Sequence, residues 1–370
     1  MRELFKLKRL YLIALLPISF VLIIISRTSS FFAEKIFANH IYKWLSQLIS
    51  LITGIIPISL AELIIIALPI VVILLLIQFI YKIIKNKEDR IYNFFKGLIN
   101  LICAVSVLVF LFTTLTGINY YRYSFTYYAE LEVRDSSLNE LYALTDSLAK
   151  QANDLREEIP MTDEEGVFKL SMSVFELAKE ADKAMEELGK EYPVLSGNYS
   201  APKPIILSSL MSYTEITGIF IPFTMEANVN VHIPDYSIPY TMLHELAHLR
   251  GFMGEDEANY IAYLAGMSSP NPELQYSSTM LALITSANAL YRQDPGLYFE
   301  IRQTYSNGVE KDIRANSQYW KKYDNTVVST VSNKVNDSYL KINAQEDGVK
   351  SYGRMLDLLL AKFIQDQEKQ

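Results

Sequence analysis

Two histidines four residues apart, with a glutamate directly after the first, are the residues of this sequence best suited to chemistry. His244, Glu245 and His248 form an H-E-x-x-H motif, and the chain has only 4 histidines. Residues i and i+4 lie on one face of a helix, so both imidazoles can bind one Zn²⁺. Glu245 is rotated by about 100° from His244 and can reach a zinc-bound water as a general base. The motif predicts one zinc ion per chain, held on a helix.

Zinc of this kind needs a third protein ligand and an open fourth position. No histidine follows His248, and the single cysteine lies far away in an apolar stretch, so we expect a carboxylate. Glu255, Asp256 and Glu257 stand at the start of a second expected helix, over residues 255–265. Acidic residues also favour helix N-termini through the helix dipole, so we expect one of the three to bind the metal.

The register of that second helix favours Glu255 over Glu257. Glu255 and Asn259 are i and i+4, so Asn259 can hold a zinc histidine by a hydrogen bond. Glu257 lies about 200° around the helix from Glu255, and its i+4 neighbour is Ile261, which cannot orient a histidine. The linker after the motif is short and must turn sharply at residues 251–254, so Glu257 stays open as the alternative ligand.

The order of these residues resembles the gluzincin metallopeptidases. In that family H-E-x-x-H is followed on the next helix by Glu-x-x-Ala-(Asp/Asn), which here is the stretch from Glu255 to Asn259. The resemblance implies that Glu255 is the third zinc ligand and that Asn259 supports a zinc histidine. Many gluzincins have Asp at the second position, so the support here is neutral rather than anionic.

The same resemblance suggests how a substrate is held. Gluzincins bind extended peptide by backbone pairing to an antiparallel edge strand that precedes the active helix. The candidates for that strand are four consecutive residues, Asn228, Val229, Asn230 and Val231. A donor must also stabilise the oxyanion of the transition state. Because no later histidine is present, we expect a tyrosine, and the candidates are Tyr339 and Tyr352.

A second resemblance covers nearly the whole chain. Three of its segments are IPISLAEL at residues 56–63, GIFIPFTMEANVN at 218–230 and NDSYLKINAQEDGVKSYGRM at 336–355. With the H-E-x-x-H region, they look like a bacterial membrane family catalogued as domain of unknown function 3810. This resemblance implies an N-terminal membrane anchor and an outer domain similar to zinc peptidases. It implies no substrate.

The elements that position the motif are expected to be mostly helical. Leucines at helical spacing over residues 130–158, and an Ala/Glu/Lys-rich face over 167–190, predict two helices that pair as a hairpin. Three short β-branched segments predict strands: residues 204–210, 218–223 and 228–233. The fold class is therefore α+β. Residues 122–370 are expected to form a zincin-like (gluzincin) domain, mostly α-helical with a small mixed sheet.

The first third of the chain is apolar enough to lie in a membrane. Hydrophobic residues are 50% of the chain and charged residues 20%, below the roughly 25% of an average soluble domain. A helix needs about 20 apolar residues to cross a bilayer. Uncharged stretches predict three transmembrane helices, over residues 10–26, 63–81 and 97–121. Residues 1–121 are therefore expected to form a membrane domain in the lipid bilayer.

Charge predicts the orientation of this anchor. Basic residues gather before the first span and at residues 82–96, and basic segments beside spans tend to stay cytoplasmic. An even number of spans then separates them, so the diluted apolar stretch 44–61 is expected to lie on the outer membrane surface as an amphipathic segment. The N-terminus is then cytoplasmic and the C-terminal domain extracytoplasmic. A net charge of −7 excludes a basic nucleic-acid-binding surface.

These features predict a zinc metallopeptidase, an endopeptidase acting at the outer face of the cytoplasmic membrane. Its partners would be the lipid bilayer and a peptide or protein substrate. The alternative is a non-catalytic zinc-containing sensor or scaffold that binds peptide or cell-envelope components. An intact Glu245 favours the peptidase, because a pure binder needs no general base.

Overall fold

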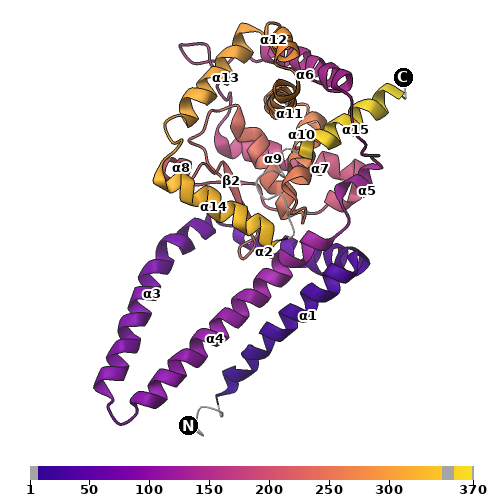
Figure 1. Ribbon diagram of the computed structural model, residues 1–370. Helices are drawn as coiled ribbons and strands as arrows, with labels where there is room; N and C mark the ends of the chain where they lie inside the picture. The colour runs from indigo at the N-terminus through magenta and orange to yellow at the C-terminus, as the bar shows by residue number, and fades with distance from the viewer. Residues whose placement is uncertain (1–6, 344–353, 369–370) are drawn as a thin grey trace.

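The computed structural model describes residues 7–343 and 354–368, and these form a helical body with long helices extending from one side (Figure 1). The elements of the extending part are η2 (Lys8–Ala14), α1 (Leu15–Thr28), η3 (Phe32–Tyr42), α2 (Lys43–Gly54), α3 (Leu60–Lys85), α4 (Arg90–Leu115) and η4 (Gly117–Tyr121). The first elements of the body are α5 (Phe125–Ala129), α6 (Leu138–Glu158), α7 (Val174–Glu191), η5 (Pro193–Leu195), β1 (Lys203–Pro204), α8 (Ser208–Ser212), β2 (Gly218–Ile221) and β3 (Glu226–Val229). The remaining helices are α9 (Ser237–Leu249), α10 (Glu255–Ser268), α11 (Pro272–Gln293), α12 (Pro295–Arg302), α13 (Asn307–Trp320), α14 (Val327–Ile342) and α15 (Met355–Glu368).

Three helical stretches of the described chain are long and apolar enough to cross a membrane: Lys8–Thr28, Leu60–Lys85 and Arg90–Leu115. The first two contain the spans expected at residues 10–26 and 63–81. The third helix ends before residue 121, because Thr116 leaves the helical conformation and η4 turns into the body with Ile118 buried. Most apolar side chains of these helices are exposed, as expected of a surface that lipid covers.

Helix α2 turns its polar side toward the body and its apolar side outward. Ser46, Ser50 and Thr53 are buried, whereas Trp44 is 77% exposed and Ile55 is 81% exposed. An apolar outer face beside three membrane helices is what an interfacial amphipathic helix presents to a bilayer. The stretch expected to be amphipathic at residues 44–61 therefore folds as a two-faced helix followed by the start of α3.

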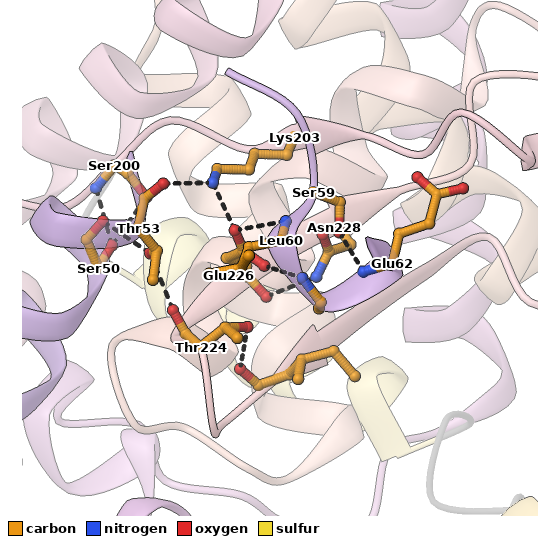
Figure 2. Close-up of polar contacts among 12 residues, drawn as sticks. Ser50, Thr53, Ser59, Leu60, Glu62, Ser200, Lys203, Thr224, Glu226 and Asn228 are labelled. Atoms are coloured by element: carbon orange, nitrogen blue, oxygen red, sulfur yellow. Dashed lines mark hydrogen bonds and ion pairs between the residues drawn. The ribbon is translucent and has the colours of Figure 1, made fainter. Parts of the chain in front are cut away.

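A polar junction joins α2 and the start of α3 to the sheet (Figure 2). Lys203 pairs with Glu226 and donates to the backbone oxygen of Thr53 at 2.7 Å. Glu226 accepts from the backbone nitrogens of Leu60 at 3.1 Å and Ala61 at 2.7 Å. These are donors of the first turn of α3, which a helix leaves without intrahelical partners. The junction, defined by these five residues, ties the second membrane helix to the sheet.

The sheet has three strands in the order β1-β3-β2, with β1 parallel and β2 antiparallel to β3. The expected small mixed sheet is confirmed, and so is the strand at residues 218–223. The strand expected at residues 204–210 is wrong. The backbone nitrogens of Ile206 and Leu207 donate to the carboxylate of Glu62 in α3 rather than to a neighbouring strand. The chain then turns into helix α8.

Helix α9 lies in the middle of the body, in contact with α7, α10, α11 and strands β2 and β3 (Figure 1). Of its 13 residues, all but Tyr240 and His244 are buried. The two helices expected to pair as a hairpin do not do so: α6 packs along α11, while α7 packs on α9 and α10. Each buries its apolar stripe against a different core helix, which a sequence periodicity does not specify. The result is a rigid core around the H-E-x-x-H helix.

Candidate metal centre

The helix that carries the motif ends in a turn that aims the next helix back at it. Gly251 follows α9 with φ of +91°, the left-handed conformation expected of a glycine after a helix end. A Cβ at this position would lie 2.9 Å from side-chain atoms of Arg122 and Tyr42, so only glycine fits. The reversal brings the start of α10 beside the histidines. The sharp turn expected at residues 251–254 is confirmed.

The turn brings His244, His248 and Glu255 together. The Nε2 atoms of His244 and His248 lie 3.2 and 3.7 Å from Oε2 of Glu255. One potential ligand atom from each residue lies within 4.8 Å of the other two. Oε2 of Glu255 is buried and has no well-oriented hydrogen-bond partner in the described part of the chain. Two imidazole nitrogens and a carboxylate oxygen fit a three-ligand zinc site.

Hydrogen bonds turn both imidazoles toward this point. Nδ1 of His244 lies 2.8 Å from Oδ1 of Asn259, and Nδ1 of His248 lies 2.7 Å from the backbone oxygen of Phe252. Both partners are acceptors, so each Nδ1 donates a hydrogen and each Nε2 is the ring nitrogen left for a metal. Asn259 occupies the position expected of it. The Phe252 oxygen was not anticipated, because a backbone acceptor has no signature in the sequence.

The cluster favours positive charge at its centre. Burial disfavours a charged His248, but neighbouring Glu255 raises the pKa of this histidine to about 9. Burial also opposes ionisation of Glu255, yet the two histidines hold its pKa well below the usual range. The carboxylate of Glu255 beside the two histidines would stabilise a metal cation at this point by the same charge interaction.

Glu245 lies beside the cluster and has a free oxygen. Burial raises the pKa of its carboxyl to about 7, although His244 and His248 oppose the rise. Its Oε2 atom is buried and has no hydrogen-bond partner among the described residues. Strand β2 passes very close, since a Cβ on Gly218 would lie 2.5 Å from Oε1 of Glu245. A carboxylate so placed can exchange a proton with a molecule in the adjacent cavity.

The alternative ligand, Glu257, points elsewhere. Its Oε1 atom accepts a hydrogen bond from the backbone nitrogen of Phe125, at the start of α5. Burial raises the pKa of this carboxyl to about 7, and the neighbouring Asp256 contributes to the rise. Glu257 therefore fastens α10 to α5, and the structure brings Glu255, not Glu257, to the two histidines.

A cavity of about 860 Å³ opens over these residues, within the range of roughly 300–1,000 Å³ typical of ligand pockets. His244, Glu245, His248 and Glu255 line it, together with β2, the end of α4 and one side of α14. Tyr339, a candidate oxyanion donor, also lines the cavity, and its hydroxyl accepts from that of Tyr120 at 3.2 Å. Tyr352, the other candidate, lies outside the described residues.

The expected peptide-binding strand is wrong. Asn228 and Val229 belong to β3, the central strand, whose two edges are taken by β1 and β2. Asn230 and Val231 follow the strand, and the Asn230 side chain is tied to Ser212 and to the backbone oxygen of Ile216. The edge strands are β1 and β2, and of these two it is β2 that lines the cavity. The error arose because sequence alternation marks a strand without showing its neighbours.

A family model described as "Protein of unknown function (DUF3810)" matches residues 37–360. The chain belongs to this family. The DUF3810 match includes helices α2 to α14, so it covers the second and third apolar helices and also His244, His248 and Glu255. No curated protein matches the chain. No solved structure matches it either. Membership of DUF3810 confirms the second resemblance and carries no activity with it.

Proposed function

We propose that this protein is a membrane-anchored zinc peptidase that hydrolyses peptide bonds beside the cell membrane. One observation supports this most strongly: the donor atoms of His244, His248 and Glu255 converge within 4.8 Å, next to Oε2 of Glu245, which has no hydrogen-bond partner in the described part of the chain. All four residues line one cavity. A site that only binds metal needs the three ligands, whereas a hydrolase also needs the fourth group.

Each side chain then has a separate task. Bound zinc supplies Lewis acidity, polarising a carbonyl and lowering the pKa of water. Glu245 takes a proton from the attacking water and passes it to the leaving amine. Asn259 and the Phe252 oxygen keep the imidazole rings in the binding orientation. Tyr339, which also lines the cavity, donates a hydrogen bond to the oxyanion.

The free edge of β2 is our proposed peptide-binding strand. It runs along the cavity from Gly218 to Ile221, and among the described residues no other strand lies beside it on the side away from β3. An extended substrate can add to such an edge by backbone hydrogen bonds, which impose little side-chain selectivity. Gly218 lets this strand lie directly against Glu245, so a paired substrate would lie beside the general base.

We further propose that the domain lies outside the cytoplasmic membrane. Lys8 and Arg9 at the start of the first span, and Lys82, Lys85 and Arg90 around the turn between α3 and α4, lie at the helix ends farthest from the body (Figure 1). Basic residues at one end of a set of spans favour the cytoplasmic side for that end. The body is then extracytoplasmic.

The test uses the full-length protein in lipid nanodiscs. Wild type and Glu245→Gln are incubated with cell extract that contains both soluble proteins and membrane vesicles, and released peptides are identified by mass spectrometry. We expect one zinc per chain in both proteins and peptide release that falls by several orders of magnitude in Glu245→Gln. Glu257→Gln, the same change at a neighbouring buried carboxyl, should keep its activity.

Two results would contradict the proposal. Zinc in the wild type with no peptide release that depends on Glu245 would instead support a sensor or scaffold. Absence of metal from the wild type would remove the metal centre itself.

Cysteines introduced one at a time at Lys87 and Ser306 of a Cys103→Ser background test the orientation, because an impermeant thiol reagent should label only position 306 on intact cells.

A further inference from the structure

The end of a membrane helix forms part of the wall of the catalytic cavity. Phe112 and Thr116, in and just after the last turn of α4, line the same cavity as the metal cluster. The Thr116 hydroxyl lies 3.0 Å from Sδ of Met253, a residue of the turn that leads to Glu255. The proposed metal site is therefore next to the point where the third span leaves the membrane.

Helix α14 also lines the cavity and has exposed valines on that side. Val328, Val331 and Val335 line the cavity and are 50%, 56% and 64% exposed. The helix is fixed to the spans at its end, where the rings of Tyr339 and Phe112 are 6.3 Å apart. Exposed apolar surface of this extent on one helix marks a site that meets other apolar material.

The charged side chains that line the cavity disfavour an anionic occupant. Among the described residues that line it are three carboxylates, those of Glu215, Glu245 and Glu255, and no lysine or arginine. Ile219 and Phe223, at 38% and 43% exposed, add apolar surface at the hairpin of β2 and β3. Apart from the proposed metal and its two histidines, a phosphate group or an acidic peptide would find no cationic partner here.

The cavity also lies level with the membrane ends of the spans. Helix α1 ends at Thr28, α3 begins at Leu60 and α4 ends at Leu115, all on the side of the body (Figure 1). Apolar exposed side chains of α3 begin at Leu63, so the hydrocarbon boundary lies close to these ends. An active site at this height can reach a chain that has only just left the bilayer.

We infer that the substrate is a membrane-anchored polypeptide, cut in an apolar segment directly beside its own membrane anchor. This inference rests on the proposed peptidase function and adds the substrate class to it. The anchor of the substrate stays in the bilayer near α3 and α4, and its first external residues enter between α14 and the β2 edge. Water adds across the peptide bond, so the products are a shortened membrane stump with a new carboxylate or amine and a released chain.

The test places one cleaved sequence at different heights. A sequence that the wild type cuts in the extract experiment is joined to a single transmembrane helix through a flexible spacer of about 5 or about 40 residues, or is left soluble. Five extended residues reach at most roughly 18 Å, whereas 40 flexible residues average roughly 35 Å. All reporters are reconstituted with, or added to, the full-length protein in vesicles.

We expect the short-spacer reporter to be cut at least as fast as the long-spacer one and at least about tenfold faster than the soluble one. Both anchored reporters share the same enrichment in the membrane, so their comparison isolates height. Cleavage of the long-spacer or soluble reporter with sparing of the short one would overturn the inference while leaving the peptidase intact. Failure of Glu245-dependent cleavage on every reporter, including the original sequence, would overturn the peptidase itself.

A matched pair of variants tests the apolar wall. Val335 lines the cavity, whereas Val327 is an exposed valine of the same helix that does not line the cavity. Val335→Asn and Val327→Asn therefore make the same change inside and outside the proposed substrate site. Val335→Asn should lower kcat/KM on the short-spacer reporter by about tenfold, the scale of a lost apolar contact, and Val327→Asn should not. Zinc content should be unchanged in both. Equal rates for the two variants would remove α14 from the substrate site.

Discussion

Two buried polar clusters of this molecule differ in how completely their atoms are paired. In the junction, Glu226 accepts two backbone N–H groups and pairs with Lys203, which also donates to Thr53 (Figure 2). In the metal centre, one oxygen of Glu245 and one of Glu255 are buried without a hydrogen-bond partner in the described chain. Both clusters lie at the boundary between the spans and the body, so burial alone does not explain the difference.

The contrast separates structure from function. An unsatisfied buried polar atom costs about 1–3 kcal/mol, so a fold retains it where something else supplies the partner. The charged groups of the junction already have protein partners, and the junction holds α3 against the sheet. The candidate metal centre leaves unpaired, among the described residues, the two oxygens that a metal and a water could contact. Variants in the two clusters should therefore change different properties of the protein.

The largest effect is expected on metal content. Glu255→Ala should strip or greatly weaken zinc binding, because it removes one of three ligands. The metal-free protein should also lose some stability, because Oε2 of Glu255 lies 3.2 and 3.7 Å from the histidine Nε2 atoms and would pair with them. Metal analysis of purified full-length protein and thermal unfolding in nanodiscs measure the two quantities.

Glu257→Ala is the control for this change. It should keep zinc and lose some stability, because Phe125 loses its acceptor. The reverse pattern would move the ligand to Glu257, and full zinc in both variants would remove the gluzincin-like assignment.

Breaking the junction should cost stability and leave the metal in place. Lys203→Met leaves the buried carboxylate of Glu226 without its cation, a change that typically costs about 3–5 kcal/mol. The double variant with Glu226→Leu should recover part of the loss; the rest reflects the unpaired N–H groups of Leu60 and Ala61.

Lys150→Met tests the same substitution at an exposed ion pair with Asp146 and should barely change unfolding. Equal effects at positions 150 and 203 would show that the junction pair contributes nothing. Loss of zinc in Lys203→Met would show that the two clusters are not separate.

A smaller effect is expected from the support of His244. Asn259→Ala should weaken zinc binding by about 10–100-fold, the usual cost of removing the partner of a metal-bound histidine. Asn259→Asp keeps the acceptor and should restore most of the affinity. Competition with a chelator measures both. If Asn259→Ala binds zinc as tightly as the wild type, the hydrogen bond has no role in orienting the ring.

The smallest effect concerns acid. Glu34 in η3 pairs with Arg122 through both carboxylate oxygens, at 2.8 and 2.9 Å, and accepts from Tyr128. Burial would raise the pKa of Glu34, but these partners bring it below the usual 4.5. The ionised form of Glu34 therefore stabilises the folded state at pH values above 4.5. This stabilisation is lost as the pH falls through the lower pKa that Glu34 has in the folded protein. Glu34→Gln should flatten the unfolding-against-pH curve below pH 4.5; an unchanged slope would exclude the pair as a source of acid sensitivity.

Much of the site followed from local sequence. The i, i+4 spacing places His244 and His248 on one face of any regular helix, and the same spacing aligns Glu255 with Asn259. Gly251 predicted the reversal between the two helices, because glycine tolerates positive φ. The three apolar stretches specified membrane-length helices. Each of these inferences depends on residues within one or two turns of one another.

What only the tertiary structure decided involves partners far apart in the chain. Thr53 and Lys203 are separated by 150 positions, and Tyr120 and Tyr339 by 219. Alternation of polar and apolar residues could not show that β3 is the central strand. The alternation distinguishes the two faces of a strand, and it is the same whether one edge or both edges are paired. Nor could it show that Phe112, at the end of a membrane span, lines the cavity of His244. Periodicity encodes which face of an element is buried; what it is buried against is set by the packing of the whole chain.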